Sequence, residues 1–153
     1  MKRSSSLRAF SLVEVTLALG VAAFSLLAIF SLLPIGLQTT QRSLEQTACT
    51  DVLSVIAADI RATPHTSATS VQFGISIPAS GGTGTTTLFF NSAGQSSPSR
   101  QSDSRYQAVV TFLPNGGGTR TATFADIKVT WPAAATTANA QGSAEVFAAF
   151  DRN

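Results

Sequence analysis

The pattern of apolar and polar positions divides the chain into three parts, of which the first is the most uniform. From Phe10 to Leu37 the residues are almost all apolar or small, and Glu14 is the only charged one. A helix needs about 20 such residues to cross a bilayer. Residues 10–37 therefore predict a transmembrane helix that carries one carboxylate near its beginning.

After Leu37 the chain turns polar but keeps a helical period. Apolar residues recur at intervals of three or four, which marks one face of an amphipathic helix: Leu44, Ala48, Val52, Val55 or Ile56, and Ile60. The charged residues mostly occupy the other positions: Glu45, Asp51, Asp59 and Arg61. Pro64 closes the segment. We predict one helix over residues 10–62, with residues 38–63 as its amphipathic second half and a bend at Pro34 and the nearby Gly36.

From Val71 the period changes to two, which is typical of strands that bury one face. Residues 71–77, 105–112 and 126–131 alternate most regularly, and residues 85–91 and 143–150 do so less cleanly. The segments between them are rich in glycine, serine and asparagine at 79–85, 91–104 and 114–118. We expect the last of these to connect two antiparallel strands as a hairpin.

Together these patterns predict an α+β fold, in which a long amino-terminal helix packs on a small antiparallel sheet of four or five strands. The apolar stripe of residues 44–60 needs a partner, and the apolar face of a sheet within residues 64–153 supplies one. Trp131 ends an alternating strand in the apolar phase, so we expect its ring to point inward.

Composition and charge narrow the classes of function. Only 12% of the 153 residues are charged and 44% are hydrophobic, whereas soluble domains average about 25% charged. The net charge of +2 arises from the leader, because Lys2, Arg3 and Arg8 precede the apolar run. Beyond it the acidic residues outnumber the basic ones by one. We therefore predict no nucleic-acid binding.

Few residues have side chains that suggest catalysis or the binding of a metal or cofactor. Cys49 is the only cysteine and fits a small apolar position on a helix face, and His65 is a lone histidine in a turn after Pro64. The acidic residues Asp103, Asp126 and Asp151 lack the spacing of a calcium-binding loop. The glycine-rich stretches lack the pattern of a phosphate-binding loop. We predict no enzymatic activity, no cofactor and no metal.

The amino terminus allows two ordinary interpretations. A secretory signal has a basic start, but its apolar stretch is 7–15 residues and ends in a small-residue cleavage site. The run here is longer, and no such site follows it. A membrane anchor fits better, with the basic residues 1–9 in the cytoplasm and the carboxy-terminal domain on the opposite, periplasmic side of the inner membrane. An anchor alone leaves Glu14 unexplained, since a carboxylate near hydrocarbon is costly.

The segment Ala9-Phe10-Ser11-Leu12-Val13-Glu14, after a basic leader and before a long apolar helix, resembles the signal of type IV prepilins and pseudopilins. The similarity is strongest to minor pilins, namely PilV-like proteins and minor pseudopilins of type II secretion, and to prepilin-type proteins of Verrucomicrobial gene cassettes. It implies cleavage between Ala9 and Phe10 by a prepilin peptidase and N-methylation of Phe10. Glu14 then becomes the fifth mature residue. The family usually has glycine where this chain has Ala9.

The resemblance also implies partners and a role for Glu14. The helix would leave the lipid bilayer to pack against other pilins or pseudopilins with the help of an inner-membrane assembly platform. In the filament, Glu14 would accept a charge-assisted hydrogen bond from the Phe10 ammonium of a neighbouring subunit. The resemblance does not separate pilus, secretion and DNA-uptake filaments. The alternative hypothesis is a single-pass envelope binding module that never joins a filament.

Overall fold

The computed structural model describes residues 11–79, 82–114 and 122–151. The chain divides into two compact units, Met1–Arg42 and Ser43–Asn153. We call them the amino-terminal unit and the head domain, and each is described by itself. The cleavage site between Ala9 and Phe10 lies outside the described residues.

Helix α1 spans Leu12–Ala62 and confirms the prediction of one long helix. It continues through Pro34 without a break in the assigned helix. A bend at Pro34 and Gly36 stays a prediction. After Ala62 the chain leaves the helix just before Pro64, whose ring disfavours helical geometry at the preceding Thr63.

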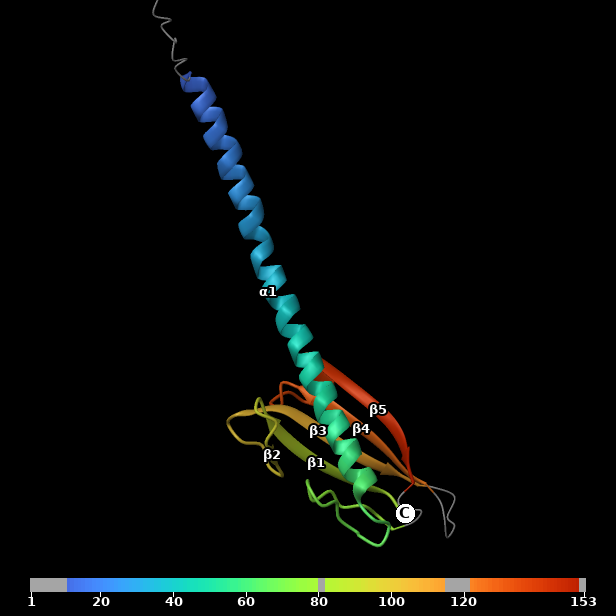
Figure 1. Ribbon diagram of the computed structural model, residues 1–153. Coiled ribbons are helices and arrows are strands. Elements are labelled where there is room, and N and C mark those ends of the chain that lie inside the picture. Colours follow the sequence, from blue (N-terminus) through green and yellow to red (C-terminus); the bar gives the residue numbers. More distant parts are fainter. Residues whose placement is uncertain (1–10, 80–81, 115–121, 152–153) are drawn as a thin grey trace, which may run out of the picture. The chain divides into compact units, whose positions relative to one another are not determined.

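The head domain contains a five-stranded sheet in which every pair of neighbouring strands is antiparallel (Figure 1). The strands are β1 (Gly84–Asn91), β2 (Ser96–Ser97), β3 (Ser104–Leu113), β4 (Thr123–Trp131) and β5 (Gly142–Phe150). A short 3₁₀ helix, η1 (Thr137–Asn139), precedes β5. The order across the sheet is β2-β1-β3-β4-β5, and the predicted α+β class is confirmed.

The second half of α1 covers one face of this sheet, and the core lies between them. Alternate residues of the three long central strands point into it, as their burial patterns show. The largest fully buried side chains include Phe90, Phe112, Phe150, Ile56, Ile60 and Ile127. Trp131 is 5% exposed, which confirms that its ring points inward. Gly142 lies directly beside that ring, where a Cβ atom would overlap it.

Four of the five predicted strands are present, and the first is wrong. Residues 71–77 form turns, with an isolated bridge between Thr69 and Ser76. Gly74 has a φ of +64°, a conformation that interrupts an extended strand. The alternation has a different origin: Ile75 and Ile77 are buried in the core, whereas Val71 is 84% exposed.

The predicted apolar face of α1 is confirmed at Val52, Ile56 and Ile60, which are buried in the core. It is wrong at Leu44, which is 66% exposed, and it omits Asp59, which is only 6% exposed. The buried residues of α1 are Cys49, Val52, Leu53, Ile56, Asp59 and Ile60. Contact with the core therefore begins about one turn later than predicted, and it includes a carboxylate that the charge pattern assigned to solvent.

The hairpin predicted between residues 105–112 and 126–131 is confirmed by the antiparallel pairing of β3 and β4. β3 and β4 pair from Gln107 opposite Thr130 to Leu113 opposite Phe124. The connection expected at residues 114–118 lies outside the described residues except for Pro114.

Candidate functional sites

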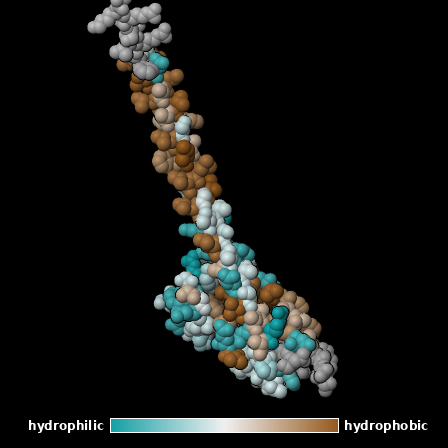
Figure 2. All heavy atoms as spheres, viewed as in Figure 1, coloured by the Kyte–Doolittle hydropathy of each residue, from teal (hydrophilic) through white to brown (hydrophobic). Residues whose placement is uncertain are grey.

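The first candidate site is the apolar surface of α1 in the amino-terminal unit. Every described residue from Ser11 to Arg42 is exposed, including large side chains such as Leu12, Phe24 and Phe30 at 83%, 76% and 61%. Figure 2 shows hydrophobic side chains along this part of the helix. It is the one helix in the described residues that is long and apolar enough to cross a membrane. By length and composition, a helix of this kind near the amino terminus can be a membrane anchor or a signal.

The polar side chains within this apolar surface are largely satisfied by the helix itself. The hydroxyl groups of Thr16, Ser25 and Ser31 donate to the backbone carbonyls of Val13, Val21 and Ala28 at 2.8–2.9 Å. Thr39 donates in the same way to Ile35 at 2.9 Å. Because bonded hydroxyls cost less to transfer out of water, these residues do not oppose burial in lipid or among other helices.

Glu14 differs from these residues because its carboxylate has no cationic partner among the described residues. It lies in the first turn of α1, and its backbone N–H donates to the Ser11 carbonyl at 3.0 Å. The unpaired N–H groups of a helix amino terminus favour negative charge nearby. The position is thus suited to a carboxylate, yet it leaves the charge available to another molecule. Ala9 and Phe10, the predicted processing residues, lie outside the described residues.

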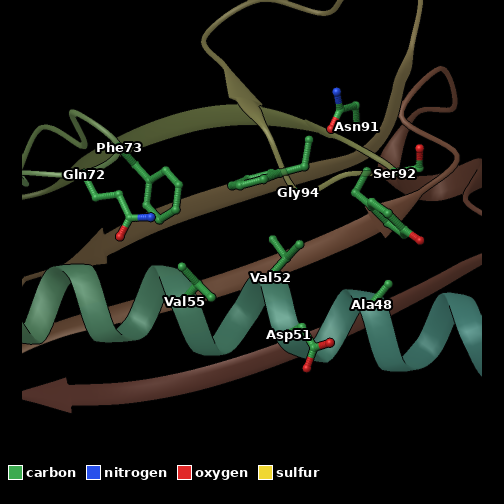
Figure 3. A pocket seen from close by; sticks show the side chains of 11 residues that line it. Ala48, Asp51, Val52, Val55, Gln72, Phe73, Asn91, Ser92 and Gly94 are labelled. Atoms are coloured by element: carbon green, nitrogen blue, oxygen red, sulfur yellow. The ribbon is translucent and has the colours of Figure 1, made fainter.

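The second candidate site is a cleft in the head domain between α1, the turns that follow it and the β1–β2 hairpin (Figure 3). Its volume is about 250 Å³. Ala48, Val52 and Val55 form the helical wall, and Phe73 and Phe90 form much of the opposite wall. The two rings meet edge to face, with centroids 5.5 Å apart. Sequence patterns missed this cleft because it depends on the turns at 71–74, which were predicted as a strand.

Asp59 fixes one wall of the cleft. Its two carboxylate oxygens accept hydrogen bonds from the backbone N–H groups of Gln72 at 3.0 Å and Phe73 at 3.1 Å. Both of these residues line the cleft. A buried carboxylate that accepts two backbone hydrogen bonds holds the loop at a defined distance from the helix. Asp59 is therefore a positioning residue that the charge pattern did not reveal.

A second contact between helix and sheet involves Glu45, whose carboxylate forms an ion pair with Arg105 of β3. The side chains are 15% and 52% exposed, respectively. Arg105 is followed by Tyr106, which lines the cleft and is 6% exposed. Burial raises the pKa of the Tyr106 hydroxyl, against the opposing effect of the Arg105 charge. Tyr106 is thus neutral at physiological pH.

The other residues with reactive or metal-ligating side chains lie apart from one another. His65 is in an exposed turn, and Cys49 is fully buried in the core. Burial raises the pKa of the Cys49 thiol to about 11, although a hydrogen bond with the Ala144 backbone opposes the shift. Asp126 pairs with Phe147 in the β4–β5 register, while Asp103 accepts from the Asn91 side chain at 3.1 Å. In the described part of the chain, no group of three or more His, Cys, Asp or Glu residues is placed to hold a metal ion.

The sites and fold define an α+β protein with an exposed apolar helix at its amino terminus and a compact head domain. Comparison with protein-family models finds no matching family, and comparisons with curated proteins and with solved structures find no significant match.

Proposed function

We propose that the chain is the precursor of a minor pilin-like or pseudopilin-like subunit that is cleaved between Ala9 and Phe10 and assembled into a filament of the type IV pilus or type II secretion type. The observation that carries the proposal is the apolar part of α1 from Leu12 to Arg42, which is exposed throughout. Its first turn holds the Glu14 carboxylate, which has no cationic partner among the described residues. Such a surface needs a bilayer before assembly and other helices after it. The arrangement of this helix before an antiparallel sheet agrees with the layout of the family that the leader resembles.

In this function Glu14 selects the position of the incoming subunit. Cleavage creates an ammonium group at Phe10, four residues before the carboxylate. In a desolvated helix bundle an unpaired carboxylate is costly, whereas one that meets an ammonium is stabilised by a charge-assisted hydrogen bond. The proposed partner is the terminus of the neighbouring subunit, and no cationic group pairs with Glu14 among the described residues of this chain. Glu14 thus acts in assembly rather than in membrane insertion.

Two measurements test the proposal. Mass spectrometry of the amino-terminal peptide, from cells that contain a prepilin peptidase, should find a chain that begins at N-methylated Phe10. A chain that still begins at Met1 would contradict processing. Glu14→Gln should then leave insertion and cleavage intact but sharply reduce the filament-associated fraction. Asp126→Asn is the control, because it removes a carboxylate charge from the head domain at a residue that forms no ion pair among the described residues, and it should assemble normally.

A second candidate function, the single-pass envelope binding module, is favoured by the head-domain cleft. It predicts a permanent anchor, so an uncleaved leader together with normal export of the head domain would support it. The two functions are therefore distinguished by the residue at which the mature chain begins.

A further inference from the structure

The cleft of the head domain has an uneven distribution of charge. No lysine, arginine or histidine is among the residues that line it, whereas Asp51 lies at its exposed rim. The Asp51 carboxylate has no ion-pair or hydrogen-bond partner among the described residues. Among the residues that line the cleft, Asp51 is therefore the one charged side chain, and its charge is negative.

The other polar groups of the cleft do not change this balance. The Asn91 side-chain amide donates to Gln95 at 3.0 Å and to Asp103 at 3.1 Å. Its oxygen accepts from the backbone N–H groups of Ala93 and Gln95. Asn91 is thus occupied in shaping the β1–β2 connection, and Tyr106 is neutral because burial raises its pKa. Asp51 is left as the group that determines which charge the cleft accepts.

The interior of the cleft is apolar and aromatic. Val52 projects from α1 toward the sheet, and Phe73 lies opposite it (Figure 3), while Val55 also lines the cleft. Val55 is 40% exposed, so part of this apolar surface is accessible from solvent. Aliphatic stems pack on such surfaces, and aromatic rings attract cations at their faces.

We propose that this cleft binds one basic side chain, arginine or lysine, of a partner protein. The aliphatic stem of that side chain would lie against Val52, Val55 and Phe73, and its charged end would meet the Asp51 carboxylate. An arginine or lysine has both parts in one side chain, and the volume of about 250 Å³ accommodates one of them. This inference goes beyond filament assembly, because it concerns the head domain and does not involve Glu14.

The test uses the full chain in detergent micelles with isotope-labelled valine methyl groups. The probe is N-acetyl-arginine methylamide, and the comparison compound is the corresponding citrulline amide, which has nearly the same shape without the charge. We expect the arginine compound to shift the Val52 and Val55 methyl signals saturably, and the citrulline compound to bind at least about tenfold more weakly. Signals of Val129, which is buried in the core outside the cleft, should not move.

Asp51→Asn should raise the dissociation constant of the arginine compound at least about tenfold, and added salt should weaken binding to the native chain. The matched control is Asp126→Asn, because Asp126 is a carboxylate of β4 that does not line the cleft. It should leave the affinity unchanged. Equal binding of the two compounds, no saturable shift of Val52 and Val55, or no effect of Asp51→Asn would each overturn the proposal.

Discussion

The Asp59 carboxylate holds the backbone of Phe73 to helix α1, accepting from its N–H at 3.1 Å while it also accepts from Gln72 at 3.0 Å. This contact links two segments that the sequence pattern treats as unrelated: the supposed polar side of a helix and a supposed strand. One buried charge thereby determines the shape of the cleft wall.

We expect Asp59→Asn to lower the free energy of unfolding by about 2–3 kcal/mol. Asparagine keeps one acceptor oxygen but places an NH₂ group against the second backbone N–H, so a buried donor is left unpaired. The measurement is urea unfolding of the full chain in mild detergent, followed by the fluorescence of Trp131, the only tryptophan. Asp51→Asn is the control on the same helix; because Asp51 is exposed, its effect should stay within about 0.5 kcal/mol. Equal stabilities of the two variants would show that the Asp59 contacts do not stabilise the fold.

Stability should fall at high pH because of Cys49. Burial raises the pKa of its thiol to about 11 in the folded chain, whereas an exposed cysteine titrates near 8.5. A group whose pKa is higher in the folded state stabilises the fold fully below its unfolded pKa, and this contribution is lost as the pH rises through the folded pKa. Between pH 9 and pH 11 the loss from this one residue should be about 2–3 kcal/mol.

The check on Cys49 is unfolding at a series of pH values for the native chain and for Cys49→Ala. The variant should lose less stability above pH 9. Some dependence should remain, because burial raises the Tyr106 pKa in the same direction. Identical pH profiles would contradict the assignment to Cys49. A thiol reagent at pH 8 should also react with the native chain only after denaturant is added, since Cys49 is 0% exposed.

Gly142→Ala should destabilise the head domain by about 1–3 kcal/mol. A Cβ atom at this position would overlap the buried Trp131 ring, and a well-packed core must shift to accept it. Gly84→Ala is the matched control, because it lies in strand β1 and its Cβ would be 3.8 Å from the nearest atom, in Pro78. That change should be neutral or slightly stabilising. Thermal unfolding followed by Trp131 fluorescence compares them, and a Gly142→Ala variant as stable as Gly84→Ala would contradict the packing argument.

The head domain should fold without the amino-terminal unit. Ser43–Asn153 forms a compact unit of its own, and the core lies wholly within it. A chain that begins at Ser43 should be soluble and show mixed helix and strand circular dichroism with a cooperative thermal transition. A spectrum of disordered chain would mean that the core needs the preceding helix or a partner to form.

The sequence predicted those features that depend on repetition. The helix from Leu12 to Ala62 and strands β1, β3, β4 and β5 follow from apolar periods, because each period reports which side of an element is buried. It failed where burial arises from single contacts. Ile75 and Ile77 alternate like strand residues although the backbone turns at Gly74. Asp59 has a charged side chain, which is typical of exposed positions, but it is buried because two backbone N–H groups of a distant turn donate hydrogen bonds to its carboxylate.

The cleft also combines a feature that the apolar period predicts with contacts that it does not predict. Val52 was predicted on the apolar face, but nothing in the order of residues indicated that Phe73 would lie across from it with Asp51 at the rim. Glu14 is the opposite case, because its isolation in an apolar run is visible in the sequence alone. The cleft depends on turns that bring distant residues together, whereas the apolar surface around Glu14 follows from local composition.

The apolar side chains of this chain fall into two groups, one buried by folding and one left exposed by it. The head domain removes most of its apolar side chains from water by folding, while the described apolar side chains of the amino-terminal unit stay exposed in the folded chain. The heat-capacity change of unfolding measures the apolar surface that folding buries. The heat-capacity change of unfolding, measured by calorimetry of the whole chain, should therefore be that expected for a protein the size of the head domain alone. If the helix enters lipid or a bundle of helices, as the proposed function requires, burial of its apolar surface would add a separate heat-capacity change of transfer or assembly.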